Sequence, residues 1–469
     1  MEIELRDYQK EAIQKVKENK GRLLLNLCPG AGKTICALFL KQQYSFIQHV
    51  LVVCPSSIKY QWASEIHKIH PADSIQILTG HYDTRWKEDL DSVFDKDWII
   101  INYEILSEAN PKKPTWADVL SRLQFDLLIV DESHYITNPE AIRTKAVQKV
   151  ASKIKNRVLL SGTPLTKNLE DLYTQLNLVD PVQFPTAKEY KNKYCTYVLK
   201  KIHARGKTIR FNELQPPTKQ QIELLKNDMK NDVYFLGKDI VYANLPETTY
   251  QTVPCCLGDG VEEERYEWMQ EEEDTNELKR MFADTMESIG WQKIKPTIDF
   301  CKQRSELDDS KICIVAFNRD VIENLHENLK NSSVFFYGGM KEEERRKAVS
   351  EFINNPKIKF FIMNCNTITG LDGLNTVCST IVFCQIPYTW AVFDQCVGRI
   401  KRANSTFDKY FAYTMIADEP LDQAVYDVMM ERKNVTESLF DNAVETSKME
   451  QSFIRDVLRR AKNEPIRTY

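Results

Sequence analysis

Short apolar runs recur along both halves of the chain and are separated by longer amphipathic or polar stretches. Continuous apolar runs of this kind are typical of strands buried on both faces of a parallel sheet. The expected strands of the first half are residues 23–27, 50–54, 98–101, 127–130 and 158–161, and those of the second half are residues 312–317, 334–337, 359–363, 380–384 and 410–414. Because helical patterns lie between these runs, the sequence predicts an α/β fold with two doubly wound parallel sheets.

Two amphipathic segments of the second half predict helices with a defined buried face. Asp320 and Glu323 have the spacing of a capping box, and the apolar stripe that accompanies them consists of Val321, Ile322, Leu325 and Leu329. Residues 447–462 carry a second stripe, which predicts a brace helix packed on one of the two lobes; it consists of Phe453, Ile454, Val457 and Leu458. Contact of the neighbouring Arg455, Arg459 and Arg460 with a nucleic acid is the alternative.

A glycine-rich turn follows the first apolar run and precedes a helical pattern. In such a turn, backbone N–H groups and the helix N-terminus face the phosphates of a nucleotide. Lys33 would reach the β- and γ-phosphates, and Thr34 would bind Mg²⁺. We therefore predict an ATP site whose loop consists of Pro29, Gly30, Ala31, Gly32, Lys33 and Thr34. Leu27 departs from the full motif, which has a small residue there, so a plain turn between strand and helix is the alternative.

Two carboxylates end the apolar run at residues 127–130. Phosphoryl transfer to water needs an acid that holds the metal and a group that orients or deprotonates the water. We predict that Asp131 binds the metal and that Glu132 acts on the water. The alternative is an acidic pair that merely closes a parallel strand.

Two arginines three residues apart lie near the end of a predicted helix at residues 395–402. Planar guanidinium groups bind γ-phosphate oxygens as arginine fingers, and this is the predicted role of Arg399 and Arg402. A basic, solvated helix end is the alternative. Gly398 argues against it, because glycine is unfavourable inside a helix unless something packs close to it.

The order of these segments resembles a superfamily 2 helicase and, more narrowly, a Swi/Snf-type DNA translocase. Further motifs of that family have counterparts at residues 5–9 (the Q motif), 52–57 with Trp62 and Glu65 (motif Ia), 101–104, 161–165 with Asn168 (motif III) and 369–375 (motif V). The resemblance spans about residues 3 to 440. It implies two RecA-like lobes with ATP bound between them and DNA across another face.

The resemblance also assigns roles to individual residues. It implies that Gln9 reads the adenine, and that Gly370, Asp372 and Gln395 contribute to the nucleotide site. The residues implied near the nucleic-acid backbone are Ser56, Ser57, Asn102, Asn318 and Thr369. Ser161 and Thr163 would couple the γ-phosphate to these nucleic-acid contacts.

Residues between the two halves are similar to the annealing-helicase branch of the Swi/Snf group, whose members rewind DNA. The matching residues are Tyr194–Cys195, Asn212–Leu214 and Leu245–Pro246, with a basic hairpin-like stretch among them. Residues 234–239 depart from the branch, which has an Arg-Arg pair before the conserved Asp239.

The pattern divides the chain into four parts. We expect a first RecA-like lobe at residues 1–180, a helical insertion and linker at 181–295, a second lobe at 296–440 and a C-terminal brace helix at 441–469. The acidic runs at residues 262–264 and 271–274 of the insertion form either a solvated helix face or an acidic mimic of DNA that restrains the motor.

Composition agrees with a globular protein, since 42% of the residues are hydrophobic and 28% are charged. The net charge of −4 argues against general adhesion to nucleic acids, so a translocase needs a local basic track. Residues 200–210 are the best candidate, as a hairpin that turns at Arg205–Gly206 and carries alternating cations. A merely solvated hairpin is the alternative.

The cysteines and the N-terminal segment indicate an intracellular protein. None of the 12 cysteines forms a Cys-x-x-Cys pair, and most lie in apolar runs, as expected of reduced core residues. No apolar run approaches the ~20 residues of a membrane span. The chain begins directly in the Q-like motif, so we expect no signal or transit peptide.

Three functions compete. We prefer an ATP-driven translocase that acts as a monomer on duplex or branched DNA. A strand-separating helicase on DNA or RNA is the first alternative, and it predicts stimulation by single strands or RNA. A catalytically weak nucleic-acid clamp is the second alternative. Only Leu27 favours it, and the presence of all five catalytic candidates argues against it: Lys33, Asp131, Glu132, Arg399 and Arg402.

Overall fold

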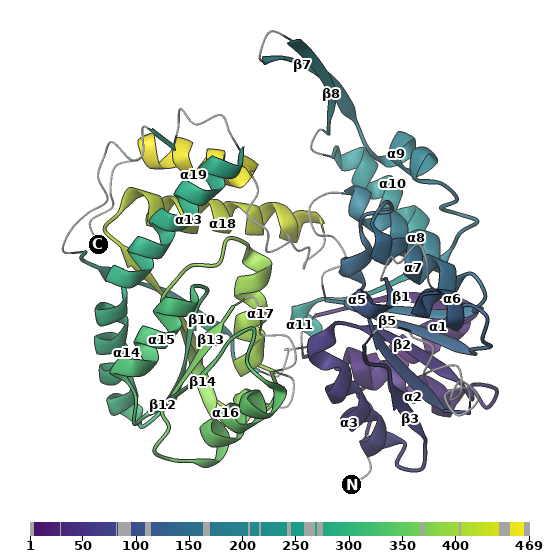
Figure 1. Cartoon of the computed structure of the whole chain (residues 1–469), viewed down its shortest axis with the longest axis horizontal. Helices are drawn as coiled ribbons and strands as arrows, with labels where there is room; N and C mark the ends of the chain where they lie inside the picture. The colour runs from purple at the N-terminus through teal and green to yellow at the C-terminus, as the bar shows by residue number, and fades with distance from the viewer. Residues whose placement is uncertain are drawn as a thin grey trace. The chain divides into compact units, whose positions relative to one another are not determined.

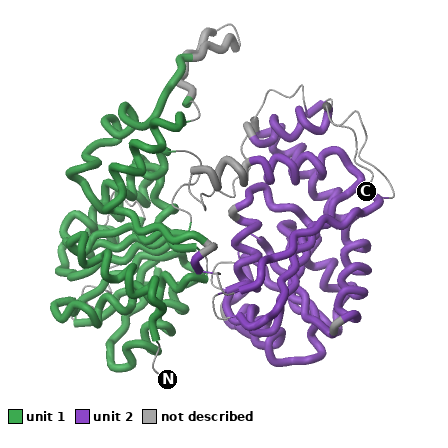
Figure 2. Tube along the Cα trace, turned by 180° about the vertical axis from the view of Figure 1, so that it is seen from behind, with its two compact units in different colours: residues 1–237, 442–444 green, residues 238–441, 445–469 purple. Residues whose placement is uncertain are grey.

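The computed structural model describes most of the chain as two compact units. The described residues are 4–28, 30–80, 82, 95–107, 114–162, 169–204, 207–214, 217–241, 245–257, 268–269, 275–365, 367, 371–402, 405–439 and 451–463. Those up to Gly237 form unit 1, and those from Lys238 onward form unit 2 (Figure 2).

Unit 1 is built on a seven-stranded parallel sheet (Figure 1). Its strands lie in the order β3-β4-β2-β5-β6-β1-β9. Their bounds are β1 (Arg22–Leu27), β2 (Val50–Cys54), β3 (Ile75–Ile77), β4 (Trp98–Asn102), β5 (Leu127–Asp131), β6 (Asn156–Ser161) and β9 (Val233–Leu236). Strands β2, β4 and β5 are buried along their whole length, as their apolar runs predict.

Helices cover both faces of this sheet (Figure 1). They are α1 (Asp7–Glu18), α2 (Lys33–Gln43), α3 (Lys59–Ile69), α5 (Tyr103–Leu106), α6 (Trp116–Leu120), α7 (Ile142–Ala151) and α8 (Tyr173–Val179), followed by α9 (Ala187–Tyr194) and α10 (Lys219–Met229). Short 3₁₀ turns occur at η1 (Ser56–Ile58), η3 (Ser133–Ile136) and η4 (Leu169–Leu172). Alternate residues of the strands pack on α5, α6 and α7, which places one continuous core on that face.

Unit 2 contains a six-stranded parallel sheet in the order β10-β15-β14-β11-β13-β12. Its strands are β10 (Thr248–Cys255), β11 (Lys311–Ala316), β12 (Ser333–Phe336), β13 (Phe360–Asn364), β14 (Cys378–Phe383) and β15 (Tyr410–Ala417). Its helices are α11 (Lys238–Val241), α13 (Thr275–Gln292), α14 (Ile294–Asp308), α15 (Arg319–Asn328), α16 (Glu342–Asn354), α17 (Trp390–Ile400), α18 (Pro420–Leu439) and α19 (Gln451–Asn463), with a 3₁₀ turn at η5 (Leu374–Thr376).

Two cores sandwich the second sheet because its side chains alternate between its faces. Cys313 and Val315 of β11 face one core, whereas Ile312 and Ile314 face the other. The first core includes the stripe of α19, in which Phe453, Ile454, Val457 and Leu458 are at most 2% exposed. The predicted brace helix is therefore confirmed.

Every strand predicted from an apolar run is present, and the α/β fold class with two doubly wound parallel sheets is confirmed. Strands β3, β9 and β10 were not predicted. Two of them lie within residues 181–295, where the sequence predicted a helical insertion: β9 pairs with β1 of unit 1, and β10 pairs with β15 of unit 2.

The predicted basic hairpin is present as strands β7 (Tyr197–Ala204) and β8 (Lys207–Leu214), which pair antiparallel (Figure 1). Ala204 lies opposite Lys207, so the turn falls at Arg205–Gly206 as expected, although those two residues lie outside the described ones. The hairpin projects from unit 1 beyond α9 and α10.

Two local predictions were wrong. Helix α15 begins at Arg319 with Asn318 as its N-cap, so Asp320 and Glu323 do not form a capping box; Glu323 pairs with Arg319 instead. The predicted apolar face of this helix is nevertheless buried. Helix α17 ends at Ile400, so Arg402 lies just beyond the helix and not on its face.

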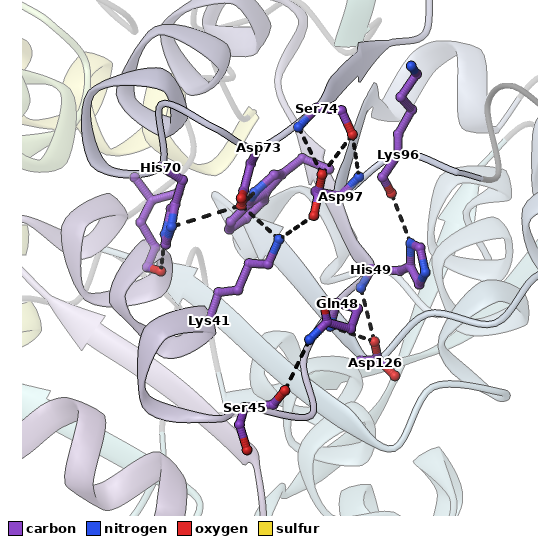
Figure 3. Close-up of polar contacts among 12 residues, drawn as sticks. Lys41, Ser45, Gln48, His49, His70, Asp73, Ser74, Lys96, Asp97 and Asp126 are labelled. Carbon is purple, nitrogen blue, oxygen red and sulfur yellow. Dashed lines mark hydrogen bonds and ion pairs between the residues drawn. The ribbon is translucent and has the colours of Figure 1, made fainter.

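A polar network connects the last turn of α2 with the residues just before β3 and β4 (Figure 3). Lys41 Nζ lies 2.7 Å from Asp73 Oδ2 and 2.8 Å from Asp97 Oδ1. Asp97 also accepts hydrogen bonds from the backbone and hydroxyl of Ser74. Partial burial raises the pKa of Asp97, but these contacts, chiefly the bond from Lys41, outweigh it and lower that pKa to about 2.

A search of the described helices finds none that is long and apolar enough to span a membrane.

Candidate nucleotide and nucleic-acid site

Predicted site residues line one edge of the unit 1 sheet, where its parallel strands end. In the order of the strands across the sheet, Asn102 ends β4, Ser56 follows β2, Asp131 ends β5, Ser161 ends β6 and the phosphate loop (residues 28–34) follows β1. The carboxyl edge of a parallel sheet is where α/β proteins bind ligands. The residues predicted to contact nucleic acid therefore stand at one end of this row, and those predicted to hold the nucleotide stand at the other.

The backbone of the phosphate loop requires glycine. Gly30 and Gly32 have φ angles of 80° and 81°, and a Cβ at Gly32 would lie 2.4 Å from the amide nitrogen of Gln9. Helix α2 begins directly after Gly32 and has no side-chain cap, so its positive end suits an anion. Lys33 Nζ donates to the carbonyl of Leu27, 3.0 Å away. Because the Leu27 side chain is buried, this departure from the motif changes the strand core and not the loop backbone.

Gln9 supports the loop from α1. Its Nε2 donates to the carbonyl of Ala31 at 3.0 Å, and its Oε1 accepts from the backbone of Arg6. The hydroxyl of Tyr8 donates to the same Ala31 carbonyl at 3.2 Å. Gln9, implied by resemblance to read adenine, thus also fixes the phosphate loop.

Asp131 is buried and held by three groups. Its Oδ2 accepts from Trp62 Nε1 at 2.8 Å, its Oδ1 accepts from the backbone N–H of Glu132 at 2.9 Å, and its carbonyl accepts from the hydroxyl of Tyr103 at 2.6 Å. Burial and the neighbouring charge of Glu132 raise the pKa of Asp131 to about 6. Each carboxylate oxygen keeps a further lone pair, so this donor set fits a Mg²⁺ ion.

Glu132 leaves the strand in the left-handed region, with a φ angle of 50°. Its Oε2 lies 3.2 Å from His134 Nδ1, and the same nitrogen lies 3.4 Å from Ser161 Oγ. His134 therefore connects the predicted water-activating acid with the first of the predicted coupling residues.

The predicted nucleic-acid residues of unit 1 differ in access. Ser56 is exposed and Ser57 is half-buried in the turn η1. Asn102 is only 4% exposed, and its Nδ2 donates to Glu104 Oε2 at 2.6 Å. Its Oδ1 is buried with no hydrogen-bond partner among the described residues.

Both predicted arginine fingers of unit 2 bind the segment that precedes η5. Arg399 Nη1 and Arg402 Nη2 donate to the carbonyl of Leu371 at 3.1 and 2.8 Å, and Arg402 Nη1 lies 2.9 Å from Asp372 Oδ1. The structure thus brings Arg399, Arg402 and Asp372 together within unit 2. Gln395 lies on the same helix as Arg399.

Asn318 has its amide engaged inside unit 2. Its Nδ2 donates to Glu287 Oε2 at 3.1 Å, and its Oδ1 accepts from Gln385 Nε2 at 2.7 Å. Because the amide nitrogen carries two N–H groups, a phosphate contact by this side chain would use the second one.

Several predicted residues lie outside the described ones. They are Pro29, Thr163, Asn168, Thr369, Gly370 and the acidic runs at residues 262–264 and 271–274.

Sequence reasoning missed three residues that organise the site. Trp62 and Tyr103 bind Asp131, and His134 binds Glu132. Trp62 belongs to the motif Ia counterpart and Tyr103 to the segment 101–104, whereas His134 follows the acidic pair by two residues. Their positions in these motifs were the available signal.

The comparison with protein families decides the class of the chain. Residues 8–304 match the SNF2-related domain, and residues 292–404 match the helicase conserved C-terminal domain. The chain belongs to the SNF2-related family. This confirms the predicted class, a Swi/Snf-type ATPase of the helicase superfamily.

Curated relatives of this SNF2-related chain include proteins named as annealing helicases. The DNA annealing helicase and endonuclease ZRANB3 of Bos taurus is 23% identical over 471 residues, which cover 96% of this chain and 42% of the relative. A SWI/SNF-related matrix-associated actin-dependent regulator of chromatin subfamily A-like protein 1 homolog of Caenorhabditis elegans is 23% identical over 447 residues, covering 91% and 61%. The chain thus spans less than two thirds of the length of these relatives.

Among solved structures, the SWI2/SNF2 ATPase core of Sulfolobus solfataricus in complex with dsDNA aligns over 97% of each chain, with 19% identity and a TM-score of 0.44.

Proposed function

We propose that this SNF2-related chain is an ATP-driven motor that translocates on, and remodels, duplex or branched DNA. The observation that carries the proposal is the SNF2-related match across residues 8–304, which contains both the phosphate loop and the acidic pair Asp131–Glu132. The order of these groups along one edge of the unit 1 sheet supports it. The residues proposed to bind ATP lie beside the residues proposed to contact nucleic acid.

Unit 1 supplies the nucleotide site in this proposal. Lys33 and the backbone of residues 28–34 bind the phosphates of ATP, and Gln9 contacts the adenine. Thr34 and Asp131 would hold a Mg²⁺ ion, which would supply positive charge beside the phosphate oxygens. Glu132 orients the attacking water, and His134 keeps its carboxylate in place from 3.2 Å.

Unit 2 supplies the arginines. Arg399 and Arg402 stabilise charge on the γ-phosphate as it transfers, a contribution of about 10³–10⁵ in rate for arginine fingers. During phosphoryl transfer, Arg402 would leave Asp372 and pair with the γ-phosphate instead. Since these groups come from a different unit than the phosphate loop, hydrolysis is tied to closure of one unit on the other.

In this proposal, hydroxyl and amide groups contact the nucleic acid, and they bind its phosphates without reading the bases. Ser56 and Ser57 are accessible for this role, whereas Asn102 acts through the short turn that it begins. DNA is the proposed polymer because the relatives are named as a DNA annealing helicase and a regulator of chromatin. Rewinding of complementary strands is the corresponding remodelling activity.

An intracellular monomer is proposed as the working form. The twelve cysteines, all within the described part of the chain, form no disulfide, and most are buried.

A single ATPase panel tests the proposal. The rate is measured without nucleic acid and with single-stranded DNA, duplex DNA, forked DNA and RNA, and Lys33→Ala serves as the inactive control. Stimulation that is strongest with duplex or forked DNA is expected. Stronger stimulation by RNA or single strands, together with unwinding of a tailed duplex, would assign the chain to the strand-separating helicases instead.

A further inference from the structure

Asp131 receives hydrogen bonds from two segments that also carry predicted nucleic-acid residues. Trp62 lies on α3, which continues directly from the turn η1 that contains Ser56 and Ser57. Tyr103 is the residue immediately after Asn102. Asp131, the proposed metal ligand, is therefore hydrogen-bonded to both segments of unit 1 that carry proposed nucleic-acid contacts.

Trp62 fixes the orientation of the Asp131 carboxylate. The indole ring is only 2% exposed, and its single N–H points at Asp131 Oδ2 from 2.8 Å. A packed ring has one donor direction, so the bond defines where both carboxylate oxygens lie. Because η1 ends at Ile58 and α3 begins at Lys59, no loop separates Ser57 from Trp62.

Tyr103 fixes the backbone of the same residue. Its hydroxyl donates to the Asp131 carbonyl at 2.6 Å, at the peptide that leads into the left-handed Glu132. Its ring stacks on Tyr135, with centroids 5.3 Å apart and planes 7° apart. Tyr103 is thus bonded to the acidic pair and packed on Tyr135, which lies in the turn that follows the pair.

We propose that Trp62 and Tyr103 are positioning residues that orient Asp131 toward Mg²⁺ and couple nucleic-acid contact at Ser56, Ser57 and Asn102 to that orientation. This inference rests on the proposed function, and it names how DNA would regulate the same site. Groups that bond to a metal ligand without touching the metal typically change metal affinity or activity by about 10–100-fold when they are removed.

The first experiment measures Mg²⁺ in nucleotide binding, without hydrolysis. Trp62→Phe keeps a ring and removes the N–H, and Tyr103→Phe removes only the hydroxyl. Trp98→Phe is the matched control, because Trp98 is also buried and its Nε1 also donates to a carboxylate, Asp73 Oδ2, at 2.8 Å. Binding of a fluorescent ADP is titrated with Mg²⁺. Both test variants should need about tenfold more Mg²⁺ for half-maximal binding, and the control should match the unmodified chain.

The second experiment measures the ratio of ATPase rates with and without duplex DNA. The ratio should fall in Trp62→Phe and Tyr103→Phe and stay unchanged in Trp98→Phe. An unchanged Mg²⁺ requirement in both test variants would overturn the inference. A raised Mg²⁺ requirement with an intact ratio would overturn the coupling to nucleic acid. Failure of the proposed function would look different, since the unmodified chain itself would show no DNA-stimulated ATPase.

Discussion

Glu132 has a strained backbone, and polar contacts hold both its backbone N–H and its carboxylate. A non-glycine residue with a φ angle of 50° costs roughly 1–3 kcal/mol, and such strain is concentrated at functional sites. Here the strain is held by the bond from its own N–H to Asp131 Oδ1 and by the contact between its carboxylate and His134. The turn ends the strand and places the Glu132 carboxylate 3.2 Å from His134, whose Nδ1 also lies 3.4 Å from Ser161 Oγ.

Glu132→Gln should abolish ATP hydrolysis and leave ATP binding intact. The amide keeps the size of the carboxylate but cannot accept a proton from water. Turnover is measured under saturating ATP, and binding is measured with a fluorescent ATP. Glu140→Gln, which changes an exposed acid of the same unit, is the control. Normal turnover by Glu132→Gln would show that the water assignment is wrong.

Arg402→Ala should lower kcat by about a thousandfold or more while nucleotide affinity changes little, because an arginine finger acts mainly in the transition state. Steady-state kinetics and equilibrium binding of ADP separate the two effects. Arg319→Ala, which removes an exposed guanidinium from the same unit, is the control. Equal losses of kcat and affinity would assign Arg402 to binding of the ground state.

At the scale of elements, α2 is fixed at both ends. Its first residues carry the phosphate loop, and Lys41 in its last turn binds Asp73 and Asp97. The side chain of Lys41 is 10% exposed, so its ammonium is largely withdrawn from water between two carboxylates. The helix that presents Lys33 and Thr34 is therefore tied to β4, the strand that carries Asn102.

Lys41→Met should destabilise unit 1 because it leaves two partly buried carboxylates facing each other without a cation. The expected loss is about 1–3 kcal/mol, less than for a fully buried pair, and the expected fall in Tm is about 3–8 °C. Thermal unfolding at neutral pH measures it. Lys145→Met, which breaks an exposed pair with Glu140, should change Tm by much less. Equal effects would mean that the network adds no stability.

The apolar runs predicted every interior strand of the two sheets and the edge strand β12, but they missed the other edge strands, β3, β9 and β10. In β9 burial alternates with partial exposure, and β10 has one fully buried residue, Cys255, so neither shows a continuous apolar run. The site was predicted where a motif is contiguous, as in residues 28–34 and 131–132. The bond between Trp62 and Asp131 joins residues 69 positions apart, and only the fold of the sheet brings them together.

Charge is distributed unevenly over the whole molecule. The chain has a net charge of −4, yet residues 200–210 of the β7–β8 hairpin contain Lys200, Lys201, Lys207 and Arg210 with no acidic residue among them. Affinity for DNA comes mainly from cations that replace the counterions of the phosphates, so an acidic protein that binds DNA must concentrate its cations. The hairpin projects from unit 1, which suits contact with a long polymer (Figure 1).

Replacing Lys200, Lys201, Lys207 and Arg210 by Gln should therefore weaken binding to duplex DNA and reduce its dependence on salt. Each phosphate contact that is lost lowers the slope of log K against log salt by about 0.9. The affinity is measured at several salt concentrations, and the basal ATPase rate should be unchanged because the hairpin is separate from the sheet that carries the phosphate loop. A control variant replaces Lys145, Lys149, Lys153 and Lys155, which lie on or after α7, by Gln. If both variants bind with the same salt slope as the unmodified chain, the hairpin is a solvated surface feature, and the basic track must lie elsewhere on the molecule.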